Sequence, residues 1–321
     1  MSKPVAAVLL AILLAGCAVR PPSPERFAFA VFGDTPYNVR EERHFLDMMG
    51  RIDAESVAFV VHVGDFKAGG GSPCTDALFE KRKAQLDASR HPLIYTPGDN
   101  EWTDCRRPSN GATDPIERLA RLRQIFFADA WSLGRERIAT AFQGECIERS
   151  GTACTCPAHP ENRRWAHARV RFVTLNIPGS DNNVGFDRAN DEEARCRNEA
   201  NRRWLEQAVV ESAGDDTLAL VVAIQANPWE KTSKPAVYQP FLAQLQDAAQ
   251  RLRKPLLFVH GDTHTYRYDM PFLDATGQPI ANLRRLEVHG SPIVGWVKVT
   301  VDAMLPDLFQ VEPHIQGVVL N

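Results

Sequence analysis

The sequence predicts an α/β fold in which strand ends bring acidic side chains to one edge of a sheet. Short apolar runs alternate with segments whose apolar residues recur at helical spacing, a pattern typical of this class. Four of the runs are followed closely by a Gly-Asp pair: residues 27–32, 57–63, 93–96 and 256–259. In a largely parallel sheet the carboxyl ends of the strands lie along one edge, where open α/β folds bind their ligands.

Helical periodicity follows each of the first three strands. Residues 41–52 and 76–88 carry apolar side chains at helical spacing. Residues 114–117, Asp-Pro-Ile-Glu, supply an N-cap aspartate, a proline at the first helical position and a glutamate at the third. We therefore expect a third helix that begins there and ends near residue 127.

The second half of the chain predicts two buried strands and two long amphipathic helices, in the order 170–175, 191–210, 218–224 and 237–253. Three short antiparallel strands are then expected to close a second sheet, at residues 284–288, 295–301 and 309–312. Residues 128–165 lose this periodicity and hold three cysteines, which predicts a disulfide-pinned surface insertion.

Composition places the chain among ordinary soluble globular proteins. Of its 321 residues 44% are hydrophobic and 24% are charged. The formal net charge is −3 and no strongly basic tract occurs, so we expect no nucleic-acid partner. A single domain over residues 27–321 is expected, because α/β domains of this size are common.

The N-terminus predicts export. Lys3 precedes an apolar run over residues 5–14 that is too short to span a bilayer, and Leu14-Ala15-Gly16-Cys17 follows. This stretch resembles the lipobox of bacterial lipoproteins, in which the cysteine is acylated and becomes the first residue of the mature protein. An ordinary cleaved signal peptide is the alternative.

The lipobox resemblance implies a signal peptide over residues 1–16, lipidation of Cys17 and a proline-rich tether over residues 17–26. Ala18, rather than an aspartate, follows the cysteine, which in a Gram-negative host favours the periplasmic face of the outer membrane. We expect this lipid anchor to be the protein's only contact with the membrane.

The other six cysteines are expected to form disulfides, because an even number in an exported chain favours pairing. Cys74 and Cys105 each lie shortly after a Gly-Asp strand end, and we expect them to pair. Four remain whose pairing stays open: Cys146, Cys154, Cys156 and Cys196. A zinc knot made of three of these with His159 is the alternative, which oxidising surroundings disfavour.

The aspartates of the four Gly-Asp pairs are the candidate metal ligands: Asp34, Asp65, Asp99 and Asp262. Carboxylates gathered at one sheet edge would repel one another unless a cation neutralised them. His264, two residues after Asp262, would project to the same side of an extended segment. The alternative is that these are turn or N-cap aspartates, which are common after strands.

Taken in order, the strand ends resemble the motifs of the calcineurin-like metallophosphoesterase superfamily, which includes the purple acid phosphatases. Its motifs run Asp-x-His, Gly-Asp, Gly-Asn-His-Asp/Glu, a lone His and Gly-His-x-His. The corresponding stretches here are Asp34 with Pro36, Gly64-Asp65, Gly98-Asp99-Asn100-Glu101, residues 225–227 and Gly261-Asp262-Thr263-His264. The resemblance covers about residues 27–300 and implies a four-layer α-β-β-α sandwich of two mixed sheets flanked by helices.

This resemblance implies two divalent metal ions, bridged by Asp65 and held further by Asp34, Asp99, Asp262 and His264. The chain departs from the family at several histidines, since Pro36, Asn100 and Asp262 stand in their places and Gln225 or Asn227 replaces the lone His. Oxygen ligands thus replace imidazole, which favours Mn²⁺, Mg²⁺ or Ca²⁺ over zinc or iron. Glu101 and Asp104 are expected to brace their loop.

The implied activity is hydrolysis of a phosphomonoester or phosphodiester, with a small-molecule or lipid substrate. Asn100 occupies the position of the family's catalytic histidine, and an amide cannot donate a proton as histidinium does. We therefore expect a substrate with a good leaving group, or a proton donor recruited from His260 or Tyr37. The candidates for holding phosphate oxygens are Lys67, Asn176 and Arg267. The alternative is a catalytically reduced metal- or ligand-binding envelope lipoprotein.

Overall fold

A computed structural model of the chain describes residues 26–230 and 234–319. The predicted signal peptide, Cys17 and the tether up to residue 25 lie outside the described residues. Within the described ranges no helix is long and apolar enough to cross a membrane.

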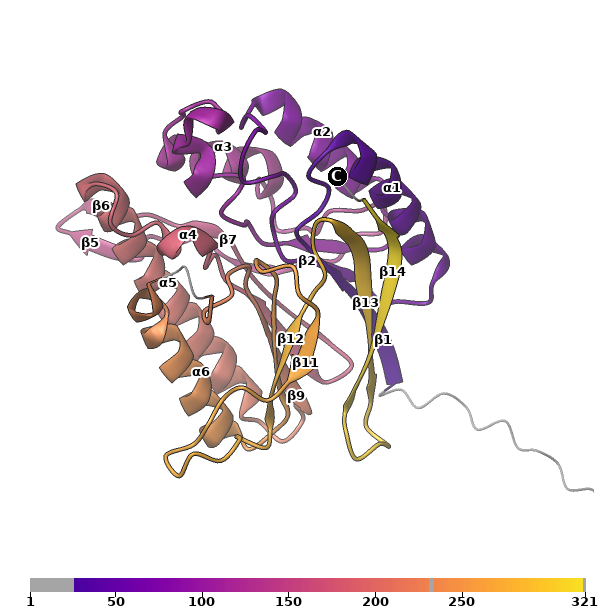
Figure 1. The fold of residues 1–321 in the computed structure, drawn as a ribbon. Helices are drawn as coiled ribbons and strands as arrows, with labels where there is room; N and C mark the ends of the chain where they lie inside the picture. Colours follow the sequence, from indigo (N-terminus) through magenta and orange to yellow (C-terminus); the bar gives the residue numbers. More distant parts are fainter. Residues whose placement is uncertain (1–25, 231–233, 320–321) are drawn as a thin grey trace, which may run out of the picture.

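Two β-sheets lie face to face between two layers of helices (Figure 1). The first sheet has the order β14-β13-β1-β2-β3, with the bounds β1 (Arg26–Phe32), β2 (Val60–His62), β3 (Leu93–Tyr95), β13 (Ile293–Asp302) and β14 (Phe309–Val318). The second has the order β11-β12-β10-β9-β8-β7-β4, with the bounds β4 (Ala141–Gln143), β7 (His159–His167), β8 (Val170–Thr174), β9 (Ala219–Ala223), β10 (Leu256–His260), β11 (Arg267–Asp269) and β12 (Leu283–Glu287). The expected four-layer sandwich is therefore confirmed.

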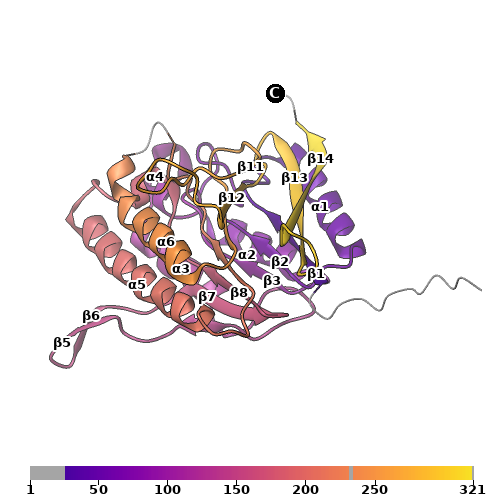
Figure 2. The same ribbon diagram turned by 90° about the horizontal axis from the view of Figure 1, so that it is seen from below.

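Helices cover the outer face of each sheet. Over the first lie α1 (Val39–Ala54), α2 (Asp76–Asp87) and α3 (Pro115–Phe126), whose apolar sides form one core with β1, β2 and β3. Over the second lie α5 (Arg188–Ser212) and α6 (Gln239–Leu252), which run side by side in Figure 2. Asn38, Thr75, Asp114 and Asp187 cap four of these helices through side-chain hydrogen bonds to backbone N–H groups.

The core between the sheets explains the continuous apolar strands. Phe29 and Val31 of β1 face this core together with Phe172 of β8 and Val221 of β9. The alternate residues of the same strands face the helices, as Ala30 does in β1. Strands buried on both faces read as unbroken apolar runs, which is why the sequence located them.

Strand direction sets the functional edge. β1, β2 and β3 are parallel to one another, and so are β8, β9, β10 and β12. Two hydrogen bonds tie these strand ends together: Asp34 N–H donates to the Gly64 carbonyl at 3.0 Å, and the Thr96 hydroxyl donates to the Leu175 carbonyl at 3.1 Å. The loops that follow both sets of parallel strands therefore meet at one edge.

Two sequence-based expectations about the second sheet are wrong. Residues 128–165 are not all a surface insertion, because β4 and most of β7 are strands of this sheet. β7 escaped detection because buried polar side chains replace the apolar alternation, Glu161 among them, paired with Arg123. The three C-terminal strands do not close the second sheet together: β12 lies in it, parallel to β10 and antiparallel to β11, whereas β13 and β14 are antiparallel as expected but belong to the first sheet beside β1.

Three disulfides connect the six remaining cysteines. Cys74–Cys105 confirms the expected pair, and the other two are Cys146–Cys154 and Cys156–Cys196. The last two hold the small β5 (Glu148–Ser150) and β6 (Ala153–Cys156) hairpin, which lies apart from the main sheets (Figure 1). With all six sulfurs in disulfides, no cysteine thiolate remains for the zinc knot.

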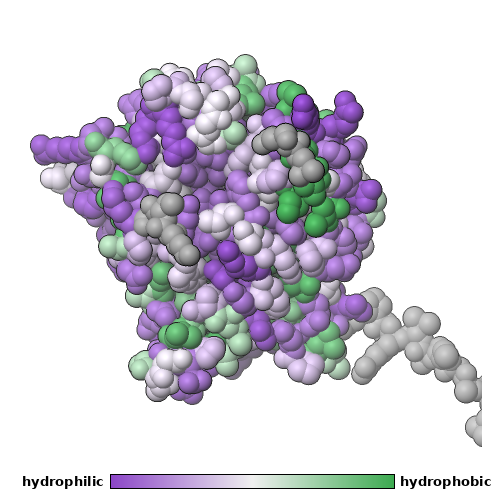
Figure 3. All heavy atoms as spheres, viewed as in Figure 1, coloured by the Kyte–Doolittle hydropathy of each residue, from purple (hydrophilic) through white to green (hydrophobic). Residues whose placement is uncertain are grey.

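The face shown in Figure 3 is mostly hydrophilic, with exposed apolar residues in small groups. One of these lies beside the end of β14, where Ile315 and Val318 are about half exposed. Scattered apolar residues of this kind are normal on soluble proteins and need no ligand to explain them.

Candidate metal centre

The chain leaves three strands through aspartates in the left-handed region of backbone space. Asp34 after β1, Asp65 after β2 and Asp262 after β10 have φ values of 52°, 60° and 80°, and His264 has 61°. This conformation is uncommon outside glycine, although short polar side chains such as aspartate tolerate it. Residues held in this way cluster at functional sites, where the surrounding contacts fix them.

The predicted ligands lie together at the shared edge. Asp65, Asp99 and Asp262 each offer a carboxylate oxygen, and these three atoms lie within 4.8 Å of one another. The Nε2 atom of His264 is 3.8 Å from Oδ1 of Asp34. The backbone N–H of Asp262 donates to the same Asp34 oxygen at 3.0 Å. Five residues from four distant loops thus converge on one place.

The glycines of the Gly-Asp pairs make this crowding possible. A Cβ atom on Gly98 would lie 2.0 Å from Oδ1 of Asp65, and one on Gly261 would lie 2.1 Å from Oδ2 of Asp34. No real side chain tolerates such contacts, so only glycine lets the backbone come this close. Each of these glycines therefore makes room for a carboxylate delivered by a different strand.

Glu101 braces the loops that carry the ligands. Its buried Oε1 atom accepts hydrogen bonds from the backbone N–H groups of Asp65 at 3.0 Å and Gly98 at 2.7 Å. The Tyr95 hydroxyl donates to the same oxygen at 2.7 Å. The expectation that Glu101 supports the loop is confirmed.

Tyr37 and Asn100 contact the expected bridging ligand. The Asn100 amide donates to Oδ2 of Asp65 at 2.8 Å, and its backbone N–H donates to Oδ1 at 3.0 Å. The Tyr37 hydroxyl lies 3.2 Å from Oδ2 of Asp65 and 3.1 Å from Nε2 of His264. Nδ1 of His264 lies 2.6 Å from the Ser291 carbonyl, which only accepts, so Nδ1 carries the proton and Nε2 is left as a ligand atom.

The carboxylates repel one another when no cation is bound. Burial raises the pKa of Asp34, and the negative charge of Asp262 raises this pKa further. Burial likewise raises the pKa of Asp65 and of Asp262, with the charge of Asp99 the next cause in both. The ionised cluster therefore costs folding free energy, which bound cations would offset.

The residues present fit two divalent cations. Oδ2 of Asp34 and Oδ1 of Asp99 are buried and have no hydrogen-bond partner among the described residues, a costly state for a carboxylate oxygen unless an ion satisfies it. Four carboxylates with one imidazole suit hard ions such as Mn²⁺, Mg²⁺ or Ca²⁺. Asp34 and His264 would hold one ion, Asp99 and Asp262 the other, and Asp65 both.

Divalent metal is expected to raise the melting temperature, and the gain is expected to grow with pH. Because the folded cluster has raised pKa values, the folded state binds more protons than the unfolded state, and the metal-free protein loses this part of its stability as pH rises above about 4. A ligand at 100 times its Kd adds about 2.7 kcal/mol. Melting curves with Mn²⁺ and with EDTA between pH 5 and 8 measure the difference.

The buried histidines affect the melting temperature equally with and without metal, so their contribution cancels in this comparison. Burial lowers the pKa of His62 and of His260 to about 3, which reduces stability in acid whether or not metal is bound. Subtracting the two melting temperatures at each pH leaves the contribution of the carboxylates. A metal-induced gain that shrinks as pH rises would contradict the assignment of the cluster as the metal site.

Two residues expected to bind substrate are used inside the fold instead. Lys67 is buried, and its ammonium group donates to the carbonyls of Ala68 at 2.8 Å and Asn100 at 2.7 Å. Asn176 is also buried, and its amide donates to the Glu161 carboxylate at 3.0 Å. The structure supports neither as a phosphate ligand, because both side chains are buried and neither lines the pocket beside the aspartates.

Arg267 and His260 are also misplaced for the roles expected of them. Arg267 is paired with the buried carboxylate of Glu287. His260 is fully buried on the side of β10 that faces the helices, where its ring stacks on Phe258 two residues earlier. Alternate strand residues face opposite sides, so His260 points away from the metal centre and cannot serve as its proton donor.

The metal centre opens into a pocket of about 470 Å³ that sequence reasoning located only in part. Ser180 lies on its wall and donates to Oδ2 of Asp99 at 2.7 Å, with Oδ1 of Asp104 also at 2.7 Å. Arg106 and Arg107 line the same pocket. Nothing in the local sequence marks Ser180, but the two arginines follow the Gly-Asp-Asn-Glu motif closely, which could have pointed to them.

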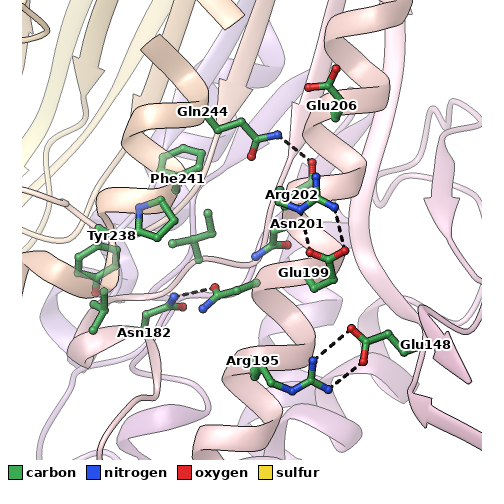
Figure 4. A pocket seen from close by; sticks show the side chains of 14 residues that line it. Glu148, Asn182, Arg195, Glu199, Asn201, Arg202, Glu206, Tyr238, Phe241 and Gln244 are labelled. Carbon is green, nitrogen blue, oxygen red and sulfur yellow. Dashed lines mark hydrogen bonds and ion pairs between the residues drawn. The ribbon is translucent and has the colours of Figure 1, made fainter. Parts of the chain in front are cut away.

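A second hollow, of about 530 Å³, lies between α5 and α6 on the outer layer (Figure 4). Its polar groups are already paired with one another, Arg195 with Glu148 and Arg202 with Glu199. It is larger than the acidic pocket and more apolar, but it contains none of the converging ligands. The chemistry therefore assigns the functional site to the acidic pocket.

The sequence matches no protein-family model and no curated protein. A solved dimetal phosphatase from Danio rerio superposes with a TM-score of 0.52 at 12% identity, covering 91% of this chain and 97% of that one. The chain has the metallophosphoesterase fold. A phosphatase from Mycoplasma pneumoniae aligns less well, with a TM-score of 0.43 at 9% identity over 90% of this chain and 93% of that one.

Within this metallophosphoesterase fold, Gln225 takes a supporting position. Its amide nitrogen donates to Asp65 at 3.1 Å and to Asp262 at 3.2 Å, while its oxygen accepts from the Gly179 backbone N–H at 2.6 Å. That last bond fixes the orientation of the amide, since a flip would set two donors against each other. Gln225 therefore orients two ligands rather than replacing the missing histidine as one.

Proposed function

We propose that the protein is a metal-dependent phosphoesterase that hydrolyses a phosphomonoester or phosphodiester at a dinuclear centre. The observation that carries the proposal is the convergence of Asp65, Asp99 and Asp262 within 4.8 Å, with Asp34 and His264 beside them. Structural aspartates have no reason to lie so close, because the arrangement destabilises the protein without a cation. The metallophosphoesterase fold supports the same proposal.

Some side chains would hold the ions, and others would lie beside the substrate. Two bound divalent ions would polarise the phosphoryl group and supply a nucleophile from water near neutral pH. The Asn100 amide lies on the pocket wall, where it donates to Oδ2 of Asp65 at 2.8 Å and to the Tyr37 hydroxyl at 3.0 Å. Both of its N–H donors are thus used, so Asn100 would orient the Asp65 carboxylate and the Tyr37 hydroxyl beside the substrate.

Tyr37 is the remaining proton donor from the sequence-based candidates. Its hydroxyl lies in the pocket, between Asp65 and His264. Burial raises the pKa of Tyr37, with the charge of Asp65 adding to this, so the hydroxyl stays protonated but is a weak acid. We therefore propose that the preferred substrates carry a good leaving group, which needs little protonation.

A catalytically reduced, metal-binding protein is the second candidate, and one observation favours it. Among the described residues no histidine other than His264 lines the pocket, because Asn100 stands in the expected position and His260 is buried elsewhere. Retention of every carboxylate fits both candidates, because each would bind cations at the cluster. Turnover distinguishes the two.

We propose that the protein is exported and anchored through a lipid on Cys17 at the periplasmic face of an outer membrane. The lipobox-like stretch before Cys17 supports this proposal, and so do the three disulfides of the folded domain. Metabolic labelling with a palmitate analogue, with Cys17→Ser as the control, tests the anchor. Equal labelling of both forms would overturn it.

The function is tested on the purified mature protein in three steps. Bound metal is measured after dialysis, a panel of phosphate monoesters and diesters is assayed with Mn²⁺, Mg²⁺, Ca²⁺ and Zn²⁺, and Asp65→Asn is assayed in parallel. We expect bound divalent metal and turnover of activated aryl phosphates, fastest with Mn²⁺.

Each outcome separates the candidates. Metal binding without turnover that depends on Asp65 would favour the binding protein. Failure to bind any of the four ions would overturn both candidates, because neither explains a converged carboxylate cluster without a cation. Turnover that survives both EDTA and Asp65→Asn would place the activity elsewhere.

A further inference from the structure

Two arginines line the acidic pocket together with the candidate ligands Asp65, Asp99 and Asp262, which carry the opposite charge. Arg106 ends the 3-10 turn η1 (Thr103–Arg106), and Arg107 follows it. Apart from His264, they are the basic side chains among the described residues that line this pocket. Cys105, fully buried and joined to Cys74, holds the turn in place. The arginines are thus carried by a rigid support.

Arg107 is compensated within the protein. Its guanidinium pairs with Asp104 at 2.5 Å and donates to the Gly69 carbonyl at 2.8 Å. Asp104 is in turn 2.7 Å from the Ser180 hydroxyl that contacts Asp99. The charge of Arg107 is therefore largely compensated by Asp104, and this pair orders the pocket wall beside the candidate metal ligands.

Arg106 is held in place without a carboxylate partner. Its guanidinium centre lies 3.2 Å from the centroid of the Phe186 ring, and Nη1 donates to the Thr103 carbonyl at 2.5 Å. Among the described residues it forms no ion pair, unlike Arg107. Arg106 lines the pocket, and beyond this stacking and this hydrogen bond its guanidinium has no further hydrogen-bond partner among the described residues. A guanidinium that is fixed in advance and not held in an ion pair is suited to an anionic ligand.

We propose that Arg106, assisted by Arg107, binds a second phosphate of the substrate, one carried by the leaving group. The inference rests on the proposed function and names its substrate class: phosphoanhydrides, or esters whose alcohol part is itself phosphorylated. A pocket of about 470 Å³ has room for more than the phosphoryl group under attack. That group would lie against the ions held by the aspartates, whereas the arginines stand on a different wall.

The experiment compares a ligand with two phosphates against a ligand with one. The Mn²⁺-loaded protein turns over an aryl phosphate, and inhibition constants are measured for inorganic pyrophosphate and inorganic phosphate at fixed free Mn²⁺. We expect wild type to bind pyrophosphate on the order of 10- to 100-fold more tightly, as charge-assisted hydrogen bonds allow. Arg106→Gln is expected to lose most of this preference, and Arg106→Lys is expected to keep part of it.

Arg251→Gln is the matched control, because Arg251 is an exposed arginine of α6 paired with Glu206, far from the pocket wall. It is expected to keep the wild-type ratio, which also corrects for chelation of Mn²⁺ by pyrophosphate. Melting temperatures show whether each variant is folded. A folded Arg106→Gln with the wild-type ratio, or a wild-type ratio near one, would overturn the subsite.

Failure of the proposed function is recognised separately. If the wild type turns over no ester, the same ratio is measured by calorimetric titration of the Mn²⁺-loaded protein with pyrophosphate and with phosphate. A preference that depends on Arg106 would then support the subsite in a protein that binds without hydrolysis. Absence of that preference would overturn the subsite in either case.

Discussion

Replacing Asp65 with asparagine is expected to lower metal-dependent turnover by at least about 1,000-fold. One oxygen of its carboxylate lies within 4.8 Å of carboxylate oxygens of Asp99 and Asp262, and the carboxylate would be shared by both ions. An amide cannot bridge two cations, and losing several kcal/mol of transition-state stabilisation corresponds to a rate change of this order. Steady-state rates and metal content, measured on the same preparations, check the prediction.

The same substitution is expected to shrink the gain in melting temperature that metal gives. Oδ1 of Asp65 accepts from the Asn100 backbone N–H, and Oδ2 accepts from the Asn100 and Gln225 amides. An asparagine amide would set its NH2 group against one of these donors, which offsets the relief of the repulsion from Asp99. Melting temperatures with Mn²⁺ and with EDTA at pH 8 measure the gain, and an unchanged gain would contradict the assignment of Asp65 as a metal ligand.

Replacing Gly261 with alanine is expected to lower activity by about 100-fold or more. The new Cβ atom would lie 2.1 Å from Oδ2 of Asp34, so the carboxylate must move by roughly 1 Å to reach an allowed contact. A shift of that size in a metal ligand costs on the order of 100-fold in rate. Overpacking should also destabilise the protein by about 1–3 kcal/mol. Activity and urea unfolding measure the two effects.

Gly50→Ala provides the matched control. Gly50 is an exposed residue inside α1, and a Cβ atom there meets nothing within 4 Å. Alanine is favoured over glycine in a helix interior by about 1 kcal/mol, so this variant should be slightly more stable and fully active. Normal activity of Gly261→Ala would mean that Asp34 adjusts freely, and its assignment as a metal ligand would lose its geometric support.

Much of the fold could be predicted because both faces of the central strands are buried. Strand β10 of the second sheet is an example, since Leu257 and Val259 face the first sheet while Leu256 and Phe258 face the helices. Such strands form unbroken apolar runs that stand out in a sequence. Strand β7 was missed for the opposite reason, because its buried Glu161 is stabilised by Arg123 from α3 rather than by apolar contacts.

The candidate metal ligands could be predicted for a related reason, whereas the other residues that line the acidic pocket could not. Each ligand aspartate follows its own strand, so strand order alone places it at the shared edge. Ser180 lies in a turn whose residues 180–183 all have positive φ, and its position depends on contacts with Asp99 and Asp104. Contacts of this kind join residues about 80 positions apart and leave no local pattern.

The sequence by itself determined the layered α/β architecture, the pairing of Cys74 with Cys105 and the five residues that converge as candidate metal ligands. These features follow from hydrophobic burial and strand direction, which local residue patterns encode. Only the tertiary structure decided that Lys67 and His260 turn inward and that Arg106 stands on the pocket wall. The direction of a side chain at a strand end or in a loop depends on which distant groups satisfy its polar atoms, and those partners meet only when the chain has folded.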